Sequence, residues 1–143
     1  MKRNGFTLIE LILVVSLILI LGTFTSAFAA RFFTQNGVSN ATDELIGDFR
    51  QAQVNAMMGK RNGNWGVNYS SNKITLYLGT SFAARTAAFD TTFSVNPSIS
   101  ITGFSDLDFF RMTGTSSATP TISISGSGET KTITVNSQGV ATR

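Results

Sequence analysis

The stretch MKRNGFTLIELILVVSLILILG (residues 1–22) decides how the first part of the chain folds. Two basic residues and a glycine precede a run of aliphatic side chains. From Leu8 to Leu21 the only polar residues are Glu10 and Ser16. A helix that is apolar on all sides is suited to a protein core or to a membrane rather than to water.

The apolar character continues more weakly to residue 30, so the segment covers residues 6–30. As a helix with a rise of about 1.5 Å per residue it would be about 37 Å long, which is enough to cross a bilayer. Lys2 and Arg3 precede the segment, and basic flanks favour the cytoplasmic side. We therefore expect a single membrane-spanning helix with a cytoplasmic N-terminus.

Glu10 is difficult to reconcile with a plain membrane anchor. An ionisable group within a membrane-spanning helix costs roughly a few kcal/mol and commonly marks a function or a partner. A secretory signal peptide is the alternative, with Ala27-Phe28-Ala29 as its small-x-small cleavage site. Neither a signal peptide nor a plain anchor gives the carboxylate a role, so Glu10 is the first candidate functional residue.

Residues 5–11, GFTLIEL, resemble the processing site of type IV pilins and type II secretion pseudopilins. The glycine, a hydrophobic residue and then Thr-Leu-Ile-Glu-Leu follow a basic leader in the family order. The resemblance implies that a prepilin peptidase cuts after Gly5, so that residues 1–5 are the leader. It also implies that the new N-terminal residue, Phe6, is N-methylated.

The same resemblance implies a role for Glu10 in assembly. Cleavage leaves a positive α-amino group on Phe6, which the Glu10 carboxylate of a neighbouring subunit can neutralise. Both charges lie in an apolar setting, where an unpaired charge is costly. The implied partners are other pilin or pseudopilin subunits, prepilin peptidase and the inner-membrane assembly platform. The implied location is the cytoplasmic (inner) membrane, followed by a periplasmic or extracellular filament.

Residues 31–63 are predicted to continue the helix with an amphipathic pattern. Apolar residues recur at helical spacing, which predicts a stripe that packs on a sheet. The stripe consists of Leu45, Phe49, Ala52 and Ala56. The pair Asn36-Gly37 predicts a kink, and the basic pair Lys60-Arg61 between two glycines predicts the helix end.

From residue 64 to residue 143 the apolar period becomes two, which predicts strands. Two alternating runs around the SSNK turn (residues 70–73) predict a hairpin. Further strands are predicted at Phe89–Val95, Ile99–Ile101, Phe109–Met112, Ile122–Ile124, Ile133–Val135 and Val140. A long helix followed only by strands predicts an α+β, pilin-like fold in which the helix packs on one antiparallel sheet.

A second, looser resemblance comes from Phe49–Ala56, followed by a basic pair, and from the strand, Gly-rich turn and strand of residues 121–143. Together they resemble the H-type minor pseudopilins and related minor pilins, which implies a minor structural subunit. Some H-like minor pilins bind DNA, which makes Lys131 and Arg143 candidate DNA contacts. So few cations predict weak binding, because DNA affinity grows with the number of phosphates neutralised.

The alternatives to a structural pilin are therefore a DNA-binding minor pilin for DNA uptake and a lone membrane-anchored β domain. The first would need more cations than the sequence places near its C-terminus. The second would leave Glu10 without a function.

Composition argues against several classes of chemistry. The 143 residues include no Cys and no His, which argues against disulfides, His-based triads and most zinc sites. The net charge is +3, and loss of Lys2 and Arg3 leaves nine basic against eight acidic side chains. Bulk charge therefore does not predict a nucleic-acid binder. With no catalytic constellation and no cofactor motif, the sequence predicts a protein that is not an enzyme.

Two weaker patterns are interpreted as turns. GSGETKT (residues 126–132) lacks the Gly-Lys-Ser/Thr order of a phosphate-binding loop, so it predicts a hairpin turn. Asp106 and Asp108 supply too few of the six or more oxygens that calcium takes. They are predicted to be turn carboxylates, and no metal is expected.

Overall fold

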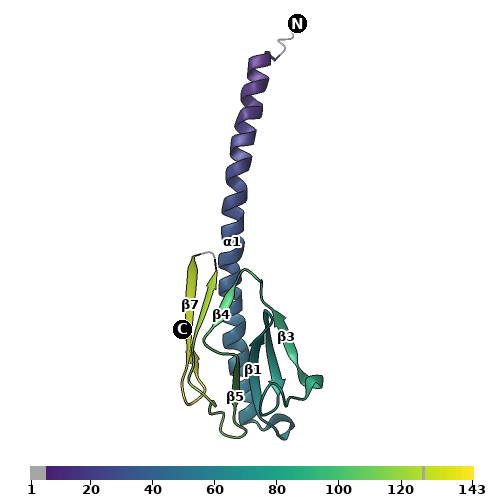
Figure 1. Ribbon diagram of the computed structural model, residues 1–143, viewed down its shortest axis with the longest axis vertical. Helices are drawn as coiled ribbons and strands as arrows, with labels where there is room; N and C mark the ends of the chain where they lie inside the picture. The colour runs from purple at the N-terminus through teal and green to yellow at the C-terminus, as the bar shows by residue number, and fades with distance from the viewer. Residues whose placement is uncertain (1–5, 127) are drawn as a thin grey trace. The chain divides into compact units, whose positions relative to one another are not determined.

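A long α-helix, α1 (Leu8–Met57), runs through the first part of the chain in the computed structural model (Figure 1). The structure describes residues 6–126 and 128–143, with the backbone alone for residues 24–35. The chain divides into two units, Met1–Phe33 and Thr34–Arg143. The second unit thus joins the last part of α1 to all the strands.

The kink predicted at Asn36-Gly37 is wrong, because α1 continues through both residues. Gly37 has a packing role instead. A Cβ atom at this position would lie 2.9 Å from the Cδ1 atom of Ile99, so only glycine lets the Ile99 side chain approach the helix this closely. The glycine therefore indicates close contact rather than a break.

The helix ends at Met57, earlier than the predicted residue 63. Gly59 follows in the left-handed conformation (φ 61°), and its N–H donates to the carbonyl of Ala56 at 2.9 Å. This arrangement is a common way to satisfy the last carbonyls of a helix. A short 3-10 helix, η1 (Lys60–Asn62), leads from there to the first strand.

The strands form two four-stranded antiparallel sheets rather than the one sheet predicted. The first has the order β3-β2-β1-β5 and contains β1 (Trp65–Ser70), β2 (Lys73–Leu78), β3 (Thr91–Ser94) and β5 (Asp106–Phe109). The second has the order β4-β6-β7-β8 and contains β4 (Ser100–Thr102), β6 (Thr121–Gly126), β7 (Glu129–Val135) and β8 (Ala141–Thr142). In Figure 1 the two groups of strands appear on opposite sides of the C-terminal half of α1.

The chain changes sheet three times, and one of these crossings, between β4 and β5, contains Gly103, whose φ is 98°. A Cβ atom on Gly103 would collide with the carbonyl oxygen of Thr121. Glycine is therefore needed both for the backbone conformation and for space at this crossing. From β4 to β6 each strand lies in the other sheet from the strand before it, which apolar alternation alone does not reveal.

The α+β fold class is confirmed, with an N-terminal helix followed by antiparallel sheets. The predicted hairpin at SSNK is confirmed, since β1 pairs with β2 through Ser71 and Asn72, whose φ angles are 50° and 57°. Two positive φ angles match the strand twist in a two-residue hairpin turn. The hairpin predicted at residues 126–132 is also present, because β6 pairs antiparallel with β7.

Several predicted strand boundaries were wrong, including Val95 and Ile99, which lie just outside β3 and β4. Phe89 belongs to a 3-10 helix, η2 (Ala87–Phe89), and Val140 precedes β8. Of the strand predicted at Phe109–Met112, only Phe109 belongs to β5, which begins at Asp106. Asp106 and Asp108 lie on the strand rather than in a turn, because they alternate with buried Leu107 and point to the other face.

The core of the second unit joins the helix stripe to both sheets. Leu45, Phe49, Ala52 and Ala56 are fully buried. The Phe49 ring lies 5.5 Å from the Phe104 ring and 6.2 Å from the Phe109 ring, centroid to centroid. The residues of the two sheets that share this core are Trp65, Val67, Ile74, Leu76, Leu78, Leu107 and Phe109, and Ile101, Ile122, Ile124, Ile133, Val135 and Ala141.

One end of the second unit carries an exposed methionine patch, made of Met57, Met58 and Met112. Their exposed fractions are 50%, 67% and 68%. The Met112 N–H donates to the carbonyl of Ala56 at 2.9 Å, which ties the turn after β5 to the end of α1. The three thioethers therefore gather where helix and turn meet.

Replacing Phe49 with alanine is expected to remove the aromatic centre of the core. Phe49→Ala should lower the free energy of unfolding by about 3–5 kcal/mol, because it loses the buried ring and leaves a cavity. Val54→Ala, at a half-exposed position of the same helix, is the control and should change it by less than about 1 kcal/mol. Urea denaturation followed by circular dichroism measures both, and equal effects would contradict the assigned core.

Asp48 is expected to make stability fall as the pH rises. It is 7% exposed, and burial, followed by the charge of Glu44, raises its pKa from 3.8 to about 7. Between about pH 4 and pH 7 the folded chain holds a proton that the unfolded chain has lost, so the free energy of unfolding decreases across this window. Asp48→Asn should remove most of this decrease and stabilise the protein by about 2–4 kcal/mol at pH 8.

Urea denaturation at pH 4, 6 and 8 tests this prediction. The variant and the wild type should be closest in stability at pH 4, where Asp48 is protonated in the folded state and about half protonated in the unfolded state of the wild type. A gain from Asp48→Asn that is the same at all three pH values would show that Asp48 does not titrate in this range.

Candidate assembly site

The first turn of α1 contains a reciprocal cap. The N–H of Glu10 donates to the Thr7 hydroxyl at 3.4 Å, and the N–H of Thr7 donates to the Glu10 carboxylate at 3.5 Å. This is the capping box, Thr-x-x-Glu, which satisfies two N–H groups that the helix cannot pair internally. A carboxylate here also lies favourably at the positive end of the helix dipole. Glu10 therefore has a local role that the sequence reasoning missed, although the Thr-x-x-Glu spacing is readable in residues 7–10.

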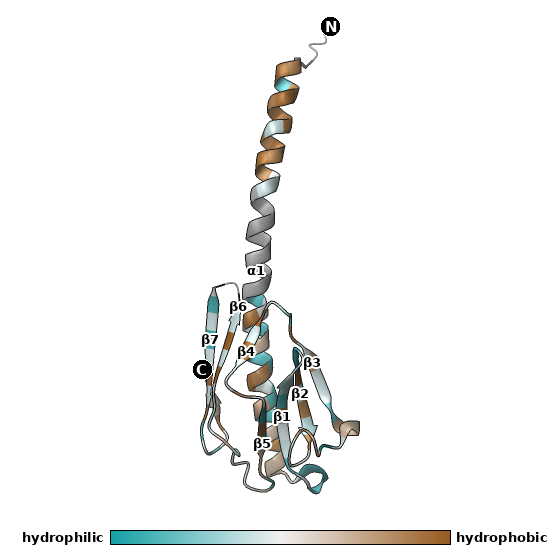
Figure 2. Ribbon diagram, viewed as in Figure 1, coloured by the Kyte–Doolittle hydropathy of each residue, from teal (hydrophilic) through white to brown (hydrophobic). Residues whose placement is uncertain are grey.

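Beyond the cap, the first unit presents large apolar side chains on every side of the helix. Phe6 is 83% exposed and Val14, the least exposed of the group, 46%. Figure 2 shows this segment as strongly hydrophobic, with one hydrophilic position in its first turns. The exposed residues are Phe6, Leu8, Ile9, Leu11, Ile12, Leu13, Val14, Val15, Leu17, Ile18, Leu19, Ile20 and Leu21.

Covering these side chains would release a large free energy. At about 1.5–3 kcal/mol for each large apolar side chain, the thirteen exposed residues correspond to about 20–40 kcal/mol. Between residues 6 and 23 the only charged side chain is that of Glu10. The segment thus combines a strong drive toward an apolar environment with a single charge at its start.

Within the residues whose side chains the structure describes, no helical segment is long and apolar enough to cross a bilayer. Residues 24–30 of the segment predicted to span the membrane lie outside this description. Gly5, after which cleavage was predicted, also lies outside the described residues.

The candidate DNA contacts, Lys131 and Arg143, are both occupied within the chain. The Lys131 ammonium donates to the Ser39 hydroxyl at 2.5 Å and lies 3.5 Å from the Glu129 carboxylate. The Arg143 guanidinium forms an ion pair with Asp43. Their charges are therefore partly neutralised before any phosphate approaches.

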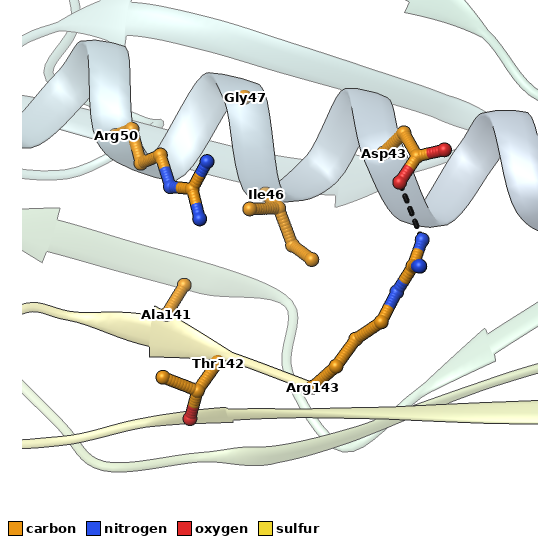
Figure 3. Close-up of a pocket in the computed structure, with 7 residues that line it drawn as sticks. All are labelled: Asp43, Ile46, Gly47, Arg50, Ala141, Thr142 and Arg143. Carbon is orange, nitrogen blue, oxygen red and sulfur yellow. Dashed lines mark hydrogen bonds and ion pairs between the residues drawn. The ribbon is translucent and has the colours of Figure 1, made fainter.

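Arg143 also lines a surface cleft of about 480 Å³ between α1 and β8 (Figure 3). Arg50 extends from the helix into the same cleft. A Cβ atom on Gly47 would meet no atom within 4 Å, so the cleft is open above this glycine. The cleft contains two guanidinium groups and one carboxylate, that of Asp43, which is paired with Arg143.

Asp106 and Asp108 lie on β5, where both carboxylates contact the Tyr77 hydroxyl. Among the residues that the structure describes, no three His, Cys, Asp or Glu side chains gather as metal ligands. The sequence analysis singled out the two aspartates. It could not predict their contact with Tyr77, because this residue lies about thirty positions away in the chain, on β2.

Comparison with known proteins identifies one feature of the chain. The model of the prokaryotic N-terminal methylation motif matches residues 1–26. These residues therefore carry the prepilin-type signature found in type IV pilins and pseudopilins. No curated protein and no solved structure matches the chain.

Proposed function

We propose that this chain is a structural subunit of a type IV pilus or of a type II secretion pseudopilus. In this proposal a prepilin peptidase processes the chain, which then assembles through its N-terminal helix. The observation that supports it most is the exposed apolar start of α1 with its single carboxylate, Glu10, inside a matched methylation motif. A filament core built from such helices would cover the exposed apolar surface.

Glu10 would select the correct position of the incoming subunit. Cleavage after Gly5 creates a positive amine on Phe6, and this amine enters an apolar surrounding when the helices pack together. An unpaired charge is costly there, whereas a carboxylate at hydrogen-bond distance offsets much of that cost. Glu10 lies in the first turn of α1, one turn from Phe6, so the charged groups of neighbouring subunits can meet near the helix starts.

Before assembly, the same apolar segment would hold the subunit in the cytoplasmic membrane. We propose a single crossing over residues 6–30, with the N-terminus on the cytoplasmic side and the folded unit on the other. An inner-membrane assembly platform would then transfer the subunit from lipid to filament. Both environments are apolar, so the transfer exposes little of the helix to water.

We further propose a minor rather than a major subunit. Support comes from the sequence of α1 around Phe49–Ala56 and the β6–β7 hairpin, which resemble the H-type minor pseudopilins. A structural rather than enzymatic role also suits a chain without cysteine or histidine.

Processing can be tested directly. Co-expression with a prepilin peptidase is expected to yield a mature chain that begins at N-methylated Phe6. Intact-mass and N-terminal peptide mass spectrometry measure this, with a chain that carries Gly5→Val as the uncut control. A mature N-terminus near residue 30, or an N-terminus at Met1 in the presence of the peptidase, would remove the proposal.

Two substitutions separate the charge of Glu10 from its cap. Glu10→Gln keeps a capping side chain but loses the charge, so we expect at least about a tenfold loss of incorporation into filaments in competition with wild type. Thr7→Val loses the cap but keeps the charge, and should incorporate nearly as wild type does. Quantitative mass spectrometry of sheared filaments measures both, normalised to membrane-inserted, processed subunit. Equal incorporation of Glu10→Gln and wild type would eliminate charge pairing.

A further inference from the structure

The outer face of the first sheet holds a fully buried tyrosine, Tyr77, whose ring crosses the neighbouring strand. Tyr77 on β2 pairs with Gly66 on β1, and Gly66 pairs with Asp108 on β5. A Cβ atom on Gly66 would lie 2.5 Å from the Tyr77 Cζ atom and 2.7 Å from the Asp108 Oδ1 atom. Glycine at this position is therefore what lets the phenol reach across β1 to the carboxylates of β5.

The hydroxyl of Tyr77 lies 2.5 Å from Oδ1 of Asp106 and 2.5 Å from Oδ1 of Asp108. A phenol has one proton to donate, and ionised carboxylates only accept. With both carboxylates ionised, one of these two close oxygen pairs would have no hydrogen between its atoms. A second proton, carried by one of the carboxyl groups, satisfies both contacts.

The surroundings favour Asp108 as the carrier of that proton. Burial raises the pKa of Asp108 to about 6, the Tyr77 hydrogen bond opposes this shift, and the charge of Asp106 adds to it. The pKa of Tyr77 is also raised, by burial and then by the two carboxylates, so the phenol keeps its own proton. Asp106 has another donor, because the N–H of Phe82 donates to its Oδ2 at 3.0 Å.

Phe82 connects this cluster to a surface loop, residues 79–86, between β2 and η2. The Phe82 ring meets the Tyr77 ring edge-on at 5.6 Å, and the Arg85 guanidinium lies 3.8 Å from the centre of the Phe82 ring. The N–H of Thr86 donates to the carbonyl of Leu78 at 2.8 Å, which closes the base of the loop. Phe82 is thus where the loop is fastened to the outer face of the sheet.

We propose that Tyr77, Asp106 and Asp108 form a proton-operated latch that holds the 79–86 loop on the sheet. With the extra proton present, a chain of hydrogen bonds runs from the Asp108 carboxyl through the Tyr77 hydroxyl to the Asp106 carboxylate, which accepts the Phe82 N–H. Loss of the proton leaves two carboxylates facing one phenol oxygen. The repulsion is relieved when the Tyr77 ring shifts. The Phe82 ring then loses its edge-on contact with the Tyr77 ring.

The other ionisable groups of this region do not compensate for that lost proton. Arg85, on the loop, pairs with Asp90 at 2.8 Å and is stacked on Phe82. On β1 the positions facing the cluster are Gly66 and Asn68, which do not titrate. The latch therefore closes in mild acid and loosens as the pH rises above that range, since the closed state binds the proton more tightly than the open one.

Amide hydrogen exchange of the full-length chain in mild detergent, at pH 5 and pH 8, tests the latch. After correction for intrinsic exchange, peptides covering residues 79–86 should lose at least about tenfold protection at pH 8 relative to β6–β7 peptides. The β6–β7 reference removes changes in global stability. Asp108→Asn supplies a permanent donor to Tyr77, so its loop should stay protected at both pH values.

Glu129→Gln, the same kind of change on the other sheet, is the matched control and should keep the wild-type pH dependence. Tyr77→Phe removes the bridging oxygen, so its loop should be less protected at pH 5 and insensitive to pH. Equal wild-type protection at the two pH values would overturn the latch, as would pH dependence that persists in Asp108→Asn or Tyr77→Phe. Protection regained at pH 8 on adding calcium chloride would overturn it too, because a cation would then take the place of the proton.

Discussion

The burial of one helical stripe by two small sheets is the constraint on which the second unit depends. Each sheet has short strands and only one face rich in apolar residues, so neither could bury that face by itself. The stripe around Leu45 and Phe49 supplies the missing surface to both. Within this stripe the Phe49 ring contacts the rings of Phe104 and Phe109. The chain contains no cysteine, so no disulfide adds to the stability that this packing provides.

Much of this arrangement can be predicted from the sequence. Apolar residues that recur every 3.6 residues in a helix, or every two residues in a strand, indicate which face of the element is buried. The stripe and the hairpins belong to this class. The division into two sheets does not, because strand pairing is a long-range choice that the crossing at Gly103 helps to set. Gly37 and Asp106 were misread for a related reason: glycine and aspartate are typical of turns, but here one admits a neighbouring side chain and the other meets Tyr77 across the sheet.

The candidate assembly site differs from the sheets, because the feature that was missed there is local. The position of Glu10 in an apolar run was enough to single it out, whereas its hydrogen bonds to Thr7 were not anticipated. The carboxylate caps its own helix, so in the proposed filament its pairing with the amine of another chain would compete with this local contact. The cap also keeps the carboxylate near the helix start, which would reduce the conformational freedom lost if the proposed pairing takes place.

The methionine patch gives the molecule a chemical vulnerability confined to one end. Met57, Met58 and Met112 are all solvent-accessible, and the remaining methionine, Met1, precedes Gly5. Peroxide would therefore convert these thioethers to sulfoxides, which makes an apolar end of the domain polar. The buried stripe contains no methionine and would not react. Methionine sulfoxide reductases can reverse that change, so oxidative damage at this end would be repairable without refolding the chain.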